Sequence, residues 1–175
     1  SSGRANSLQE PGGAANPTYG EASGIQGGAY SFDGSQRLIA PININPDEVP
    51  ELTVGAWVKT SSLDPGLRKV MGGDNGGWDR GITVSDNTGA TGFGVASGGA
   101  PIIGADITPG EWQYVVATFD TDEGVSTIYV GDSMAATLTT EATPGDDLAG
   151  AGEPVIEIGR YDNQEYNGLV DDVFV

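Results

Sequence analysis

The stretch ELTVGAWVKT, residues 51–60, carries the clearest structural signal in the chain. Its residues fall into two alternating sets, namely Leu52, Val54, Ala56 and Val58, and Thr53, Gly55, Trp57 and Lys59. Because successive side chains on a β-strand point to opposite faces, this period of two predicts a strand with one buried face. The first, apolar set is expected to face the core.

Similar strand patterns recur along the chain, about every ten residues. They fall in residues 29–42, 68–97, 112–120, 125–132, 154–160 and 168–175. The tetrapeptide TDEG, residues 121–124, predicts a hairpin between two of these segments. The 29 Gly and 10 Pro residues are typical of tight turns, and no helical pattern lies between the strands. The sequence therefore predicts an all-β sandwich or barrel over one domain, residues 1–175, with an irregular arm at 1–28.

Charge and missing residue types restrict the classes of function. Seven basic and 25 acidic residues give a formal net charge of −18, which repels nucleic acid and anionic membrane surfaces. The absence of Cys and His excludes disulfides, thiol and imidazole chemistry and the usual zinc ligands, so only metals with oxygen ligands remain. No signal peptide or membrane-spanning run is present, and the chain begins at Ser1 without Met, which indicates a piece of a longer, multidomain protein.

Six segments in order resemble a known family. They are GAYSFDGSQRLIA (28–40), LTVGAWVKT (52–60), EWQYVVATFD (111–120), STIYVGD (126–132), IEIGR (156–160) and NGLVDDVFV (167–175). Together they resemble the laminin G-like jellyroll domains of the concanavalin A-like lectin/glucanase superfamily. The resemblance implies an antiparallel jellyroll β-sandwich of two sheets, with the N-terminal arm against the last strand. Members of the superfamily include glycan- and peptide-binding modules as well as glucanases, so the activity has to be argued from the site.

The resemblance also implies a calcium site at the last strand. In related domains with a terminal Asp-x-Val strand, this Asp binds Ca²⁺, and carbonyl oxygens from the arm and from an early turn complete the shell. Carried over here, Asp171 supplies the carboxylate, with main-chain oxygens from Gly3 to Asn6 and from the turn Asp33, Gly34 and Ser35. The alternatives are that Asp171 accepts hydrogen bonds from arm amides without an ion, and that Asp33 forms an Asx turn. Adjacent Asp172 is expected on the opposite face, toward solvent.

A hydrolytic site is not expected. Retaining glucanases place two carboxylates about 5 to 5.5 Å apart, and in that branch they lie on one strand as E-x-D-x-x-E, a pattern that this sequence lacks. Glu153 with Glu157, and Asp171 with Asp172, are spaced so that neither pair converges on one bond. Without Cys or His, nucleophilic triads are also missing.

Two polar loops are the candidate ligand sites. The loop GGDNGGWDRG, residues 72–81, offers Asp74, Asn75 and Asp79 as acceptors for sugar hydroxyls or for a second calcium ion, and Trp78 as a stacking surface. The alternative is a long hairpin whose Trp packs back on the sandwich. A second cluster precedes the last strand and consists of Tyr161, Asp162, Asn163, Gln164 and Tyr166. The aromatic residues inside strand patterns, Trp57, Trp112 and Tyr114, are interpreted as packing, although Trp57 shares the face of Thr53 and Lys59.

These features predict a noncatalytic, calcium-stabilised module that binds glycans. It is expected to belong to a secreted, adhesin-like bacterial protein that is extracellular or at the cell surface, with no nucleic-acid partner and no insertion into a membrane. Two other functions stay open, a peptide- or protein-binding adhesion module and a structural spacer. A glucanase-like hydrolase ranks below them.

Overall fold

The structure is a computed structural model that describes the chain in eleven segments. They are residues 16–20, 23–25, 27–46, 48–63, 66–73, 80–85, 88–97, 101–131, 133–139, 155–159 and 164–175. These residues form thirteen β-strands and contain no helix. Accordingly, no helix that is long and apolar enough to cross a membrane occurs in these segments.

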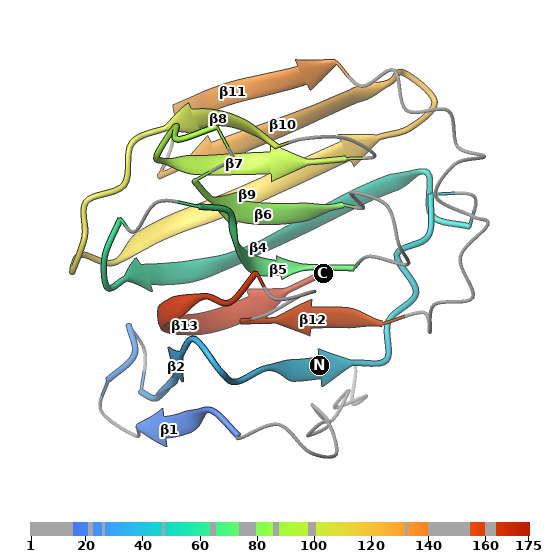
Figure 1. Cartoon of the computed structure of the whole chain (residues 1–175). Helices are drawn as coiled ribbons and strands as arrows, with labels where there is room; N and C mark the ends of the chain where they lie inside the picture. Colours follow the sequence, from blue (N-terminus) through green and yellow to red (C-terminus); the bar gives the residue numbers. More distant parts are fainter. Residues whose placement is uncertain are drawn as a thin grey trace.

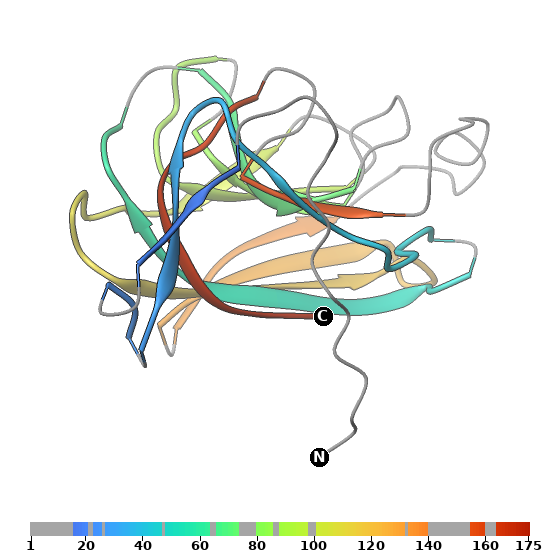
Figure 2. The same ribbon diagram turned by 90° about the horizontal axis from the view of Figure 1, so that it is seen from below.

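The strands form two antiparallel sheets, which are packed face to face as two layers (Figures 1 and 2). The first sheet has seven strands in the order β1 (Thr18–Gly20), β2 (Ala29–Asp33), β13 (Asn167–Phe174), β4 (Glu51–Thr60), β9 (Gln113–Asp120), β10 (Val125–Val130) and β11 (Ser133–Thr139). The second has six strands in the order β3 (Leu38–Ala40), β12 (Ile156–Ile158), β5 (Arg68–Gly72), β6 (Gly81–Val84), β7 (Phe93–Ala96) and β8 (Ile102–Ala105). The predicted all-β, two-sheet jellyroll sandwich is confirmed.

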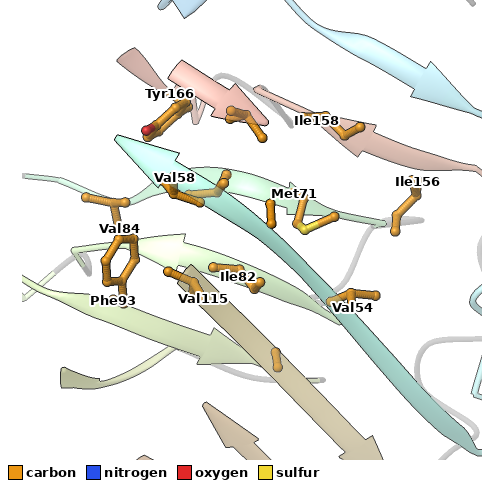
Figure 3. Packing of buried hydrophobic residues seen from close by; sticks show 14 of the residues in the cluster. Val54, Val58, Met71, Ile82, Val84, Phe93, Val115, Ile156, Ile158 and Tyr166 are labelled. Carbon is orange, nitrogen blue, oxygen red and sulfur yellow. The ribbon is translucent and has the colours of Figure 1, made fainter. Parts of the chain in front are cut away.

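The core lies between the two sheets and follows the predicted alternation. On β4, Val54, Ala56 and Val58 are at most 1% exposed, whereas Trp57 and Lys59 on the opposite face are partly exposed. Figure 3 shows the β4 valines packed against side chains of the other sheet, such as Met71 and Ile82. Apolar burial of this kind, at about 25 cal/mol per Å², is the main force that holds the sheets together.

The predicted hairpin of residues 112–132 is also confirmed, because β9 pairs with β10 from Val125 opposite Asp120 to Val130 opposite Val115. The last strand lies between the earliest strands, since β13 pairs with β2 on one side and with β4 on the other. The part of the N-terminal arm that the structure describes adds β1 to the edge of the same sheet, beside β2.

Gly159 shows how tightly the last crossover is packed. It has a φ of 86°, a left-handed conformation, and a Cβ at this position would overlap the ring of Phe32. Gly159→Ala is therefore expected to lower the free energy of unfolding by about 2–4 kcal/mol, part from backbone strain and part from overpacking. The matched control is Gly110→Ala, where φ is 80° and a Cβ would meet nothing within 4 Å. Urea unfolding should show a larger loss of unfolding free energy for Gly159→Ala than for Gly110→Ala. Equal losses would mean that the overlap with Phe32 does not destabilise the fold.

Candidate functional site

Asp171 is buried against the outer face of the seven-stranded sheet, not in the core. It lies directly opposite Trp57 of β4, which also points outward, yet Asp171 is only 8% exposed. Gly24 lies against its carboxylate, and the Ile25 N–H donates to Oδ2 at 2.8 Å. The Asp172 N–H donates to Oδ1 at 2.9 Å. Each carboxylate oxygen therefore accepts a backbone hydrogen bond, the arrangement that a buried carboxylate requires.

A β-bulge keeps both neighbouring aspartates out of the core. The pairing of β13 with β4 shifts between Asp171 and Phe174, and Asp172 has a φ of 48°. Regular alternation, which would have turned one of the two carboxylates toward the apolar side, therefore does not hold at this point. Asp172 is exposed, as expected, but the bulge and not the strand period puts it there.

The described residues do not gather the predicted calcium ligands around Asp171. Asp33 pairs with Asn167, four residues before Asp171 on β13, which corresponds to about 13 Å along the strand. The turn of Asp33, Gly34 and Ser35 therefore does not reach the same ion as Asp171. Gly3 and Asn6 lie outside the described residues, and within those residues no three acidic side chains form a group that could hold a metal.

The 33–35 turn has a local explanation. Asp33 Oδ1 accepts hydrogen bonds from the Ser35 hydroxyl at 2.7 Å and from the Ser35 N–H at 3.0 Å. These two bonds, the hydroxyl bond first, hold the pKa of Asp33 below its usual value. Asp33 thus forms an Asx turn, the alternative that its position before Gly34 had suggested.

Asp171→Ala is expected to release the turn at residues 23–25 from the sheet. The substitution leaves the Ile25 and Asp172 amides without their acceptor, at a cost of about 1–3 kcal/mol of unfolding free energy. Hydrogen exchange of the Ile25 N–H is the direct measurement, and it should become faster by about tenfold or more. Asp171→Asn keeps one oxygen acceptor, so its Ile25 exchange rate should lie between that of the native protein and that of Asp171→Ala. Equal exchange rates of the Ile25 N–H in the native protein and in Asp171→Ala would contradict the anchoring of this turn by Asp171.

The first predicted ligand loop leaves the end of β5, and the second connects β12 to β13 beside the first half of β5. Their residues Asp74, Asn75, Trp78, Asp79, Tyr161, Asp162 and Asn163 lie outside the described residues. Gly73 leaves the end of β5, and its N–H donates to the Arg80 carbonyl at 3.2 Å. The residues that flank the second loop bond to the second and third residues of β5: the Gly159 N–H donates to the Val70 carbonyl, and the Lys69 N–H donates to the Gln164 carbonyl. The ligand sites on these loops therefore stay a prediction. Gly73, beside the first loop, and Lys69, beside the second, are four residues apart along the chain.

Tyr166 does not belong to an accessible site, contrary to prediction. It is fully buried, with its ring centroid 6.3 Å from that of Phe32 and its hydroxyl 3.5 Å from Thr60 Oγ1. Burial raises the pKa of the phenol well above its usual value, so it stays protonated. The alternation of the last strand could not predict this burial, because Tyr166 precedes the strand and its side chain enters the core from the preceding loop. Gln164, by contrast, is partly exposed beside Lys69.

The outer face of the six-stranded sheet carries buried polar side chains. Glu157 and Thr83 alternate with core residues of β12 and β6 and therefore point away from the core. Arg37 pairs with Glu157 at 2.8 Å, and Lys69 lies opposite Thr83 with only 1% of its surface exposed. These polar side chains lie on or beside β5 and β12, the strands that precede the two predicted loops.

An aromatic strip crosses the outer face of the seven-stranded sheet. It consists of Trp57, Tyr114 and Phe174, from β4, β9 and β13 respectively. The ring centroids of Trp57 and Tyr114 are 5.2 Å apart, and those of Tyr114 and Phe174 are 6.2 Å apart at an interplanar angle of 25°. Gly55 makes room for the strip, because a Cβ there would come within 2.6 Å of the Phe174 ring. All three side chains keep exposed surface, and Phe174 is 36% exposed.

The interpretation of Trp57 and Tyr114 as packing residues is therefore only half right. They pack against each other, but on the solvent side of the sheet and not in the core. The signal was present in the sequence, because Trp57 shares the face of Thr53 and Lys59. What the sequence lacked was the pairing that sets Trp57 opposite Tyr114 and brings Phe174 alongside.

A groove continues from the strip along the same face, which we call the open face: the outward side of β4, β9 and β10. The groove has a volume of about 650 Å³ and lies at the end of these strands where the 121–124 turn joins β9 to β10. One row of cross-strand neighbours in it is Thr53, Thr118 and Thr127, and the next is Glu51, Asp120 and Val125. Along β4, the hydroxyl and carboxylate groups of the groove therefore come next to the aromatic strip, and the nearest of them on this strand, Thr53, is about 13 Å from Trp57.

Solved structures share this architecture. Domain 4 of AbnA, a GH43 extracellular arabinanase from Geobacillus stearothermophilus, solved in complex with arabinotriose, has a TM-score of 0.62 at 18% identity, over 91% of this chain and 74% of that one. A SAP-like pentraxin from Limulus polyphemus has a TM-score of 0.56 at 17% identity, over 82% of this chain and 72% of that one. Trypanosoma rangeli sialidase has a TM-score of 0.57 at 17% identity, over 91% of this chain but 26% of that one.

At these identities the structural likeness shows the fold, which occurs in enzymes and in binding domains alike. No curated protein sequence matches the chain. A family model does match, that of a laminin G family described as the concanavalin A-like lectin/glucanases superfamily, over residues 27–175. The match covers every strand from β2 to β13. The chain therefore belongs to this laminin G family of the concanavalin A-like lectin/glucanases superfamily.

Proposed function

We propose that the chain is a noncatalytic glycan-binding module of a larger protein that is extracellular or at the cell surface. The observation that carries the proposal is the alignment of the aromatic strip with the groove on one open face. A sugar ring has an apolar face that stacks on aromatic rings and hydroxyl groups that hydrogen-bond to side chains. The open face offers both kinds of partner within one length of β4.

The position of the strip favours a glycan over an extended peptide. Peptides that add a strand to a sheet need the free main-chain groups of an edge strand. The strip lies on β13, β4 and β9; β4 and β9 are paired on both sides, whereas β13 pairs with β2 only from Asn167 to Val170. At Trp57 and Tyr114, binding therefore depends on side chains, as stacking on sugars does. The likeness to an arabinanase domain that was solved with arabinotriose supports the same ligand class.

The absence of catalysis rests on the sequence. The alternating carboxylates of the glucanase branch are missing, and the chain has no His or Cys to build another hydrolytic centre. Calorimetric titration with neutral oligosaccharides such as arabinan, xylan and β-glucan fragments is the test, together with chromatography of the mixture after long incubation. We expect binding of at least one oligosaccharide and no cleavage. Cleavage would contradict the noncatalytic role, and the absence of any binding would leave a spacer domain.

Calcium belongs to the proposal at Asp171, with arm residues Gly3 and Asn6 as the remaining candidates for ligands. Such an ion would tie the arm to the last strand, because Ca²⁺ accepts irregular sets of six to eight oxygens. Thermal melting with chelator and with added Ca²⁺ is the measurement. A lower melting temperature in chelator, absent in Asp171→Ala, is expected if the ion binds; identical curves would assign the stabilisation to the Ile25 and Asp172 amides alone.

A further inference from the structure

Strand β9 keeps all of its outward side chains partly exposed from the aromatic strip to the groove. The residues that share this property are Tyr114, Val116, Thr118 and Asp120, which we call the β9 track. The residues between them belong to the core, so the side chains of the track share the outer face of the sheet. At about 3.4 Å per residue, the track is about 20 Å long.

The β9 track changes its chemistry in steps along the strand. Tyr114 belongs to the aromatic strip, whereas Thr118 and Asp120 line the groove. Val116 lies between them, and its side chain carries no hydrogen-bonding group. A ligand on the track therefore meets an aromatic ring first, then an apolar side chain, then a hydroxyl and finally a carboxylate.

Val116 is flanked by two aromatic side chains, one on each side. On β10 it lies opposite Tyr129, which is partly exposed. On β4 it lies opposite Gly55, and Phe174 occupies the space beside this glycine, because a Cβ there would come within 2.6 Å of the Phe174 ring. The strip and the groove are therefore joined by one continuous apolar surface.

The length of the β9 track favours a chain of sugars over a single terminal sugar. A pocket for one sugar gathers its stacking and hydrogen-bonding groups around one ring, whereas here these groups are spread over about 20 Å of strand. Each contact on an exposed surface contributes little by itself, so several rings have to bind at once. At the end of the track Asp120 lies opposite Glu51, and these two carboxylates repel acidic sugars.

We propose that the ligand is a linear, neutral oligosaccharide chain that lies along β9. One ring stacks on the aromatic strip, the next lies over Val116 beside Tyr129, and a further ring forms a hydrogen bond with the Thr118 hydroxyl. The proposal rests on the glycan-binding function above and adds its ligand class and the direction of the chain. Affinity should therefore increase with the number of sugar rings until the track is filled.

The experiment is a calorimetric titration with oligomers of β-1,4-linked glucose, β-1,4-linked xylose and α-1,5-linked arabinose, each from the disaccharide to the hexasaccharide. In at least one series, the hexasaccharide should bind about tenfold more tightly than the disaccharide. Trp57→Ala should weaken every length, because each length uses the strip. The anionic chain hexagalacturonate should bind more weakly at low salt than the neutral hexasaccharide.

Variants of β9 and β10 test the direction of the chain. Thr118→Val removes the hydroxyl and keeps the shape of the side chain, and its loss of affinity should grow with chain length to about fivefold for the hexasaccharide. Thr118→Ser keeps a hydroxyl and should retain most of the affinity. Tyr129→Ala should also weaken the hexasaccharide more than the disaccharide. Thr18→Val is the matched control, because Thr18 is exposed on edge strand β1, outside the open face, and it should bind every oligomer like the native chain. Melting curves establish that each variant is folded.

Other outcomes overturn the proposal. Equal affinities for all lengths, with Trp57→Ala still weakening each of them, would leave glycan binding intact and make the site one for a single terminal sugar. A length-dependent loss in Phe174→Ala but not in Thr118→Val would turn the chain across the strands. Tighter binding of hexagalacturonate than of the neutral hexasaccharides would contradict the neutral ligand class. If no oligomer binds, or if Trp57→Ala changes no affinity, the glycan-binding function itself fails.

Discussion

Replacing Trp57 by alanine is expected to weaken glycan binding by about 30-fold or more. Trp57 lies at one end of the aromatic strip, in contact with Tyr114, which in turn contacts Phe174. On the neighbouring strands it lies opposite Tyr114 on one side and the buried Asp171 on the other. Truncating a tryptophan that is a hot spot of a binding surface typically costs about 2 kcal/mol or more, which corresponds to this factor. Calorimetric titration with whichever neutral oligosaccharide binds best is the measurement.

Two controls separate lost stacking from lost folding. Trp57→Phe keeps an aromatic face and should recover most of the affinity, since its ring can still stack. Tyr19→Ala removes another aromatic side chain that is 53% exposed but belongs to edge strand β1, outside the strip. That variant should bind like the native chain. Unchanged affinity in folded Trp57→Ala would mean that the strip is not the binding surface.

Arg80→Ala is expected to lower the free energy of unfolding by about 3–5 kcal/mol, a larger loss than that of Gly159→Ala or Asp171→Ala. Arg80 is 2% exposed and donates to the carbonyls of Val49, Pro50 (2.9 Å) and Ile44 (3.5 Å) and to the Thr121 hydroxyl. Its guanidinium also lies 5.7 Å from the centroid of the Phe119 ring. Removing the side chain leaves one buried and three partly buried acceptors without this donor, and it opens a cavity.

The effect should appear as a drop in melting temperature of about 10 °C or more. Arg68→Ala is the matched control, because Arg68 is partly exposed and its side-chain hydrogen bond within the described residues is short-range, to the Leu67 carbonyl. Its loss should stay within about 1 kcal/mol. Arg80 also holds together the two strands that line the groove, through Pro50 before Glu51 and Thr121 after Asp120, which lies opposite Glu51. Similar losses in both variants would contradict the role of Arg80 as a clamp between the sheets.

Local pattern was sufficient to predict the sandwich. Strict alternation in residues 51–60 identified β4 and its buried face, and the TDEG turn identified the β9–β10 hairpin. Both features depend on neighbours in the chain, which a sequence displays directly. The quoted segments also sufficed to recognise the laminin G family, which the family match confirms.

Features that depend on contacts between distant residues were not predictable. The bulge at Asp172 arises from the pairing of β13 with β4, and no local rule signals it. Likewise, Tyr166 enters the core through a loop, and Arg80 finds its acceptors 30 or more residues away. The aromatic strip needs three strands in register, so Phe174 had no apparent partner in the sequence.

The most direct test of glycan binding on the open face is a residue-resolved NMR titration of the native chain with a neutral oligosaccharide. We predict that the Trp57 indole N–H and the amides of Thr53, Tyr114 and Thr118 shift in a saturable manner, while amides on the six-stranded sheet do not. Saturable shifts confined to residues 74–79 and 160–163 would place the ligand on the predicted loops instead. That result would contradict the open face as the binding surface.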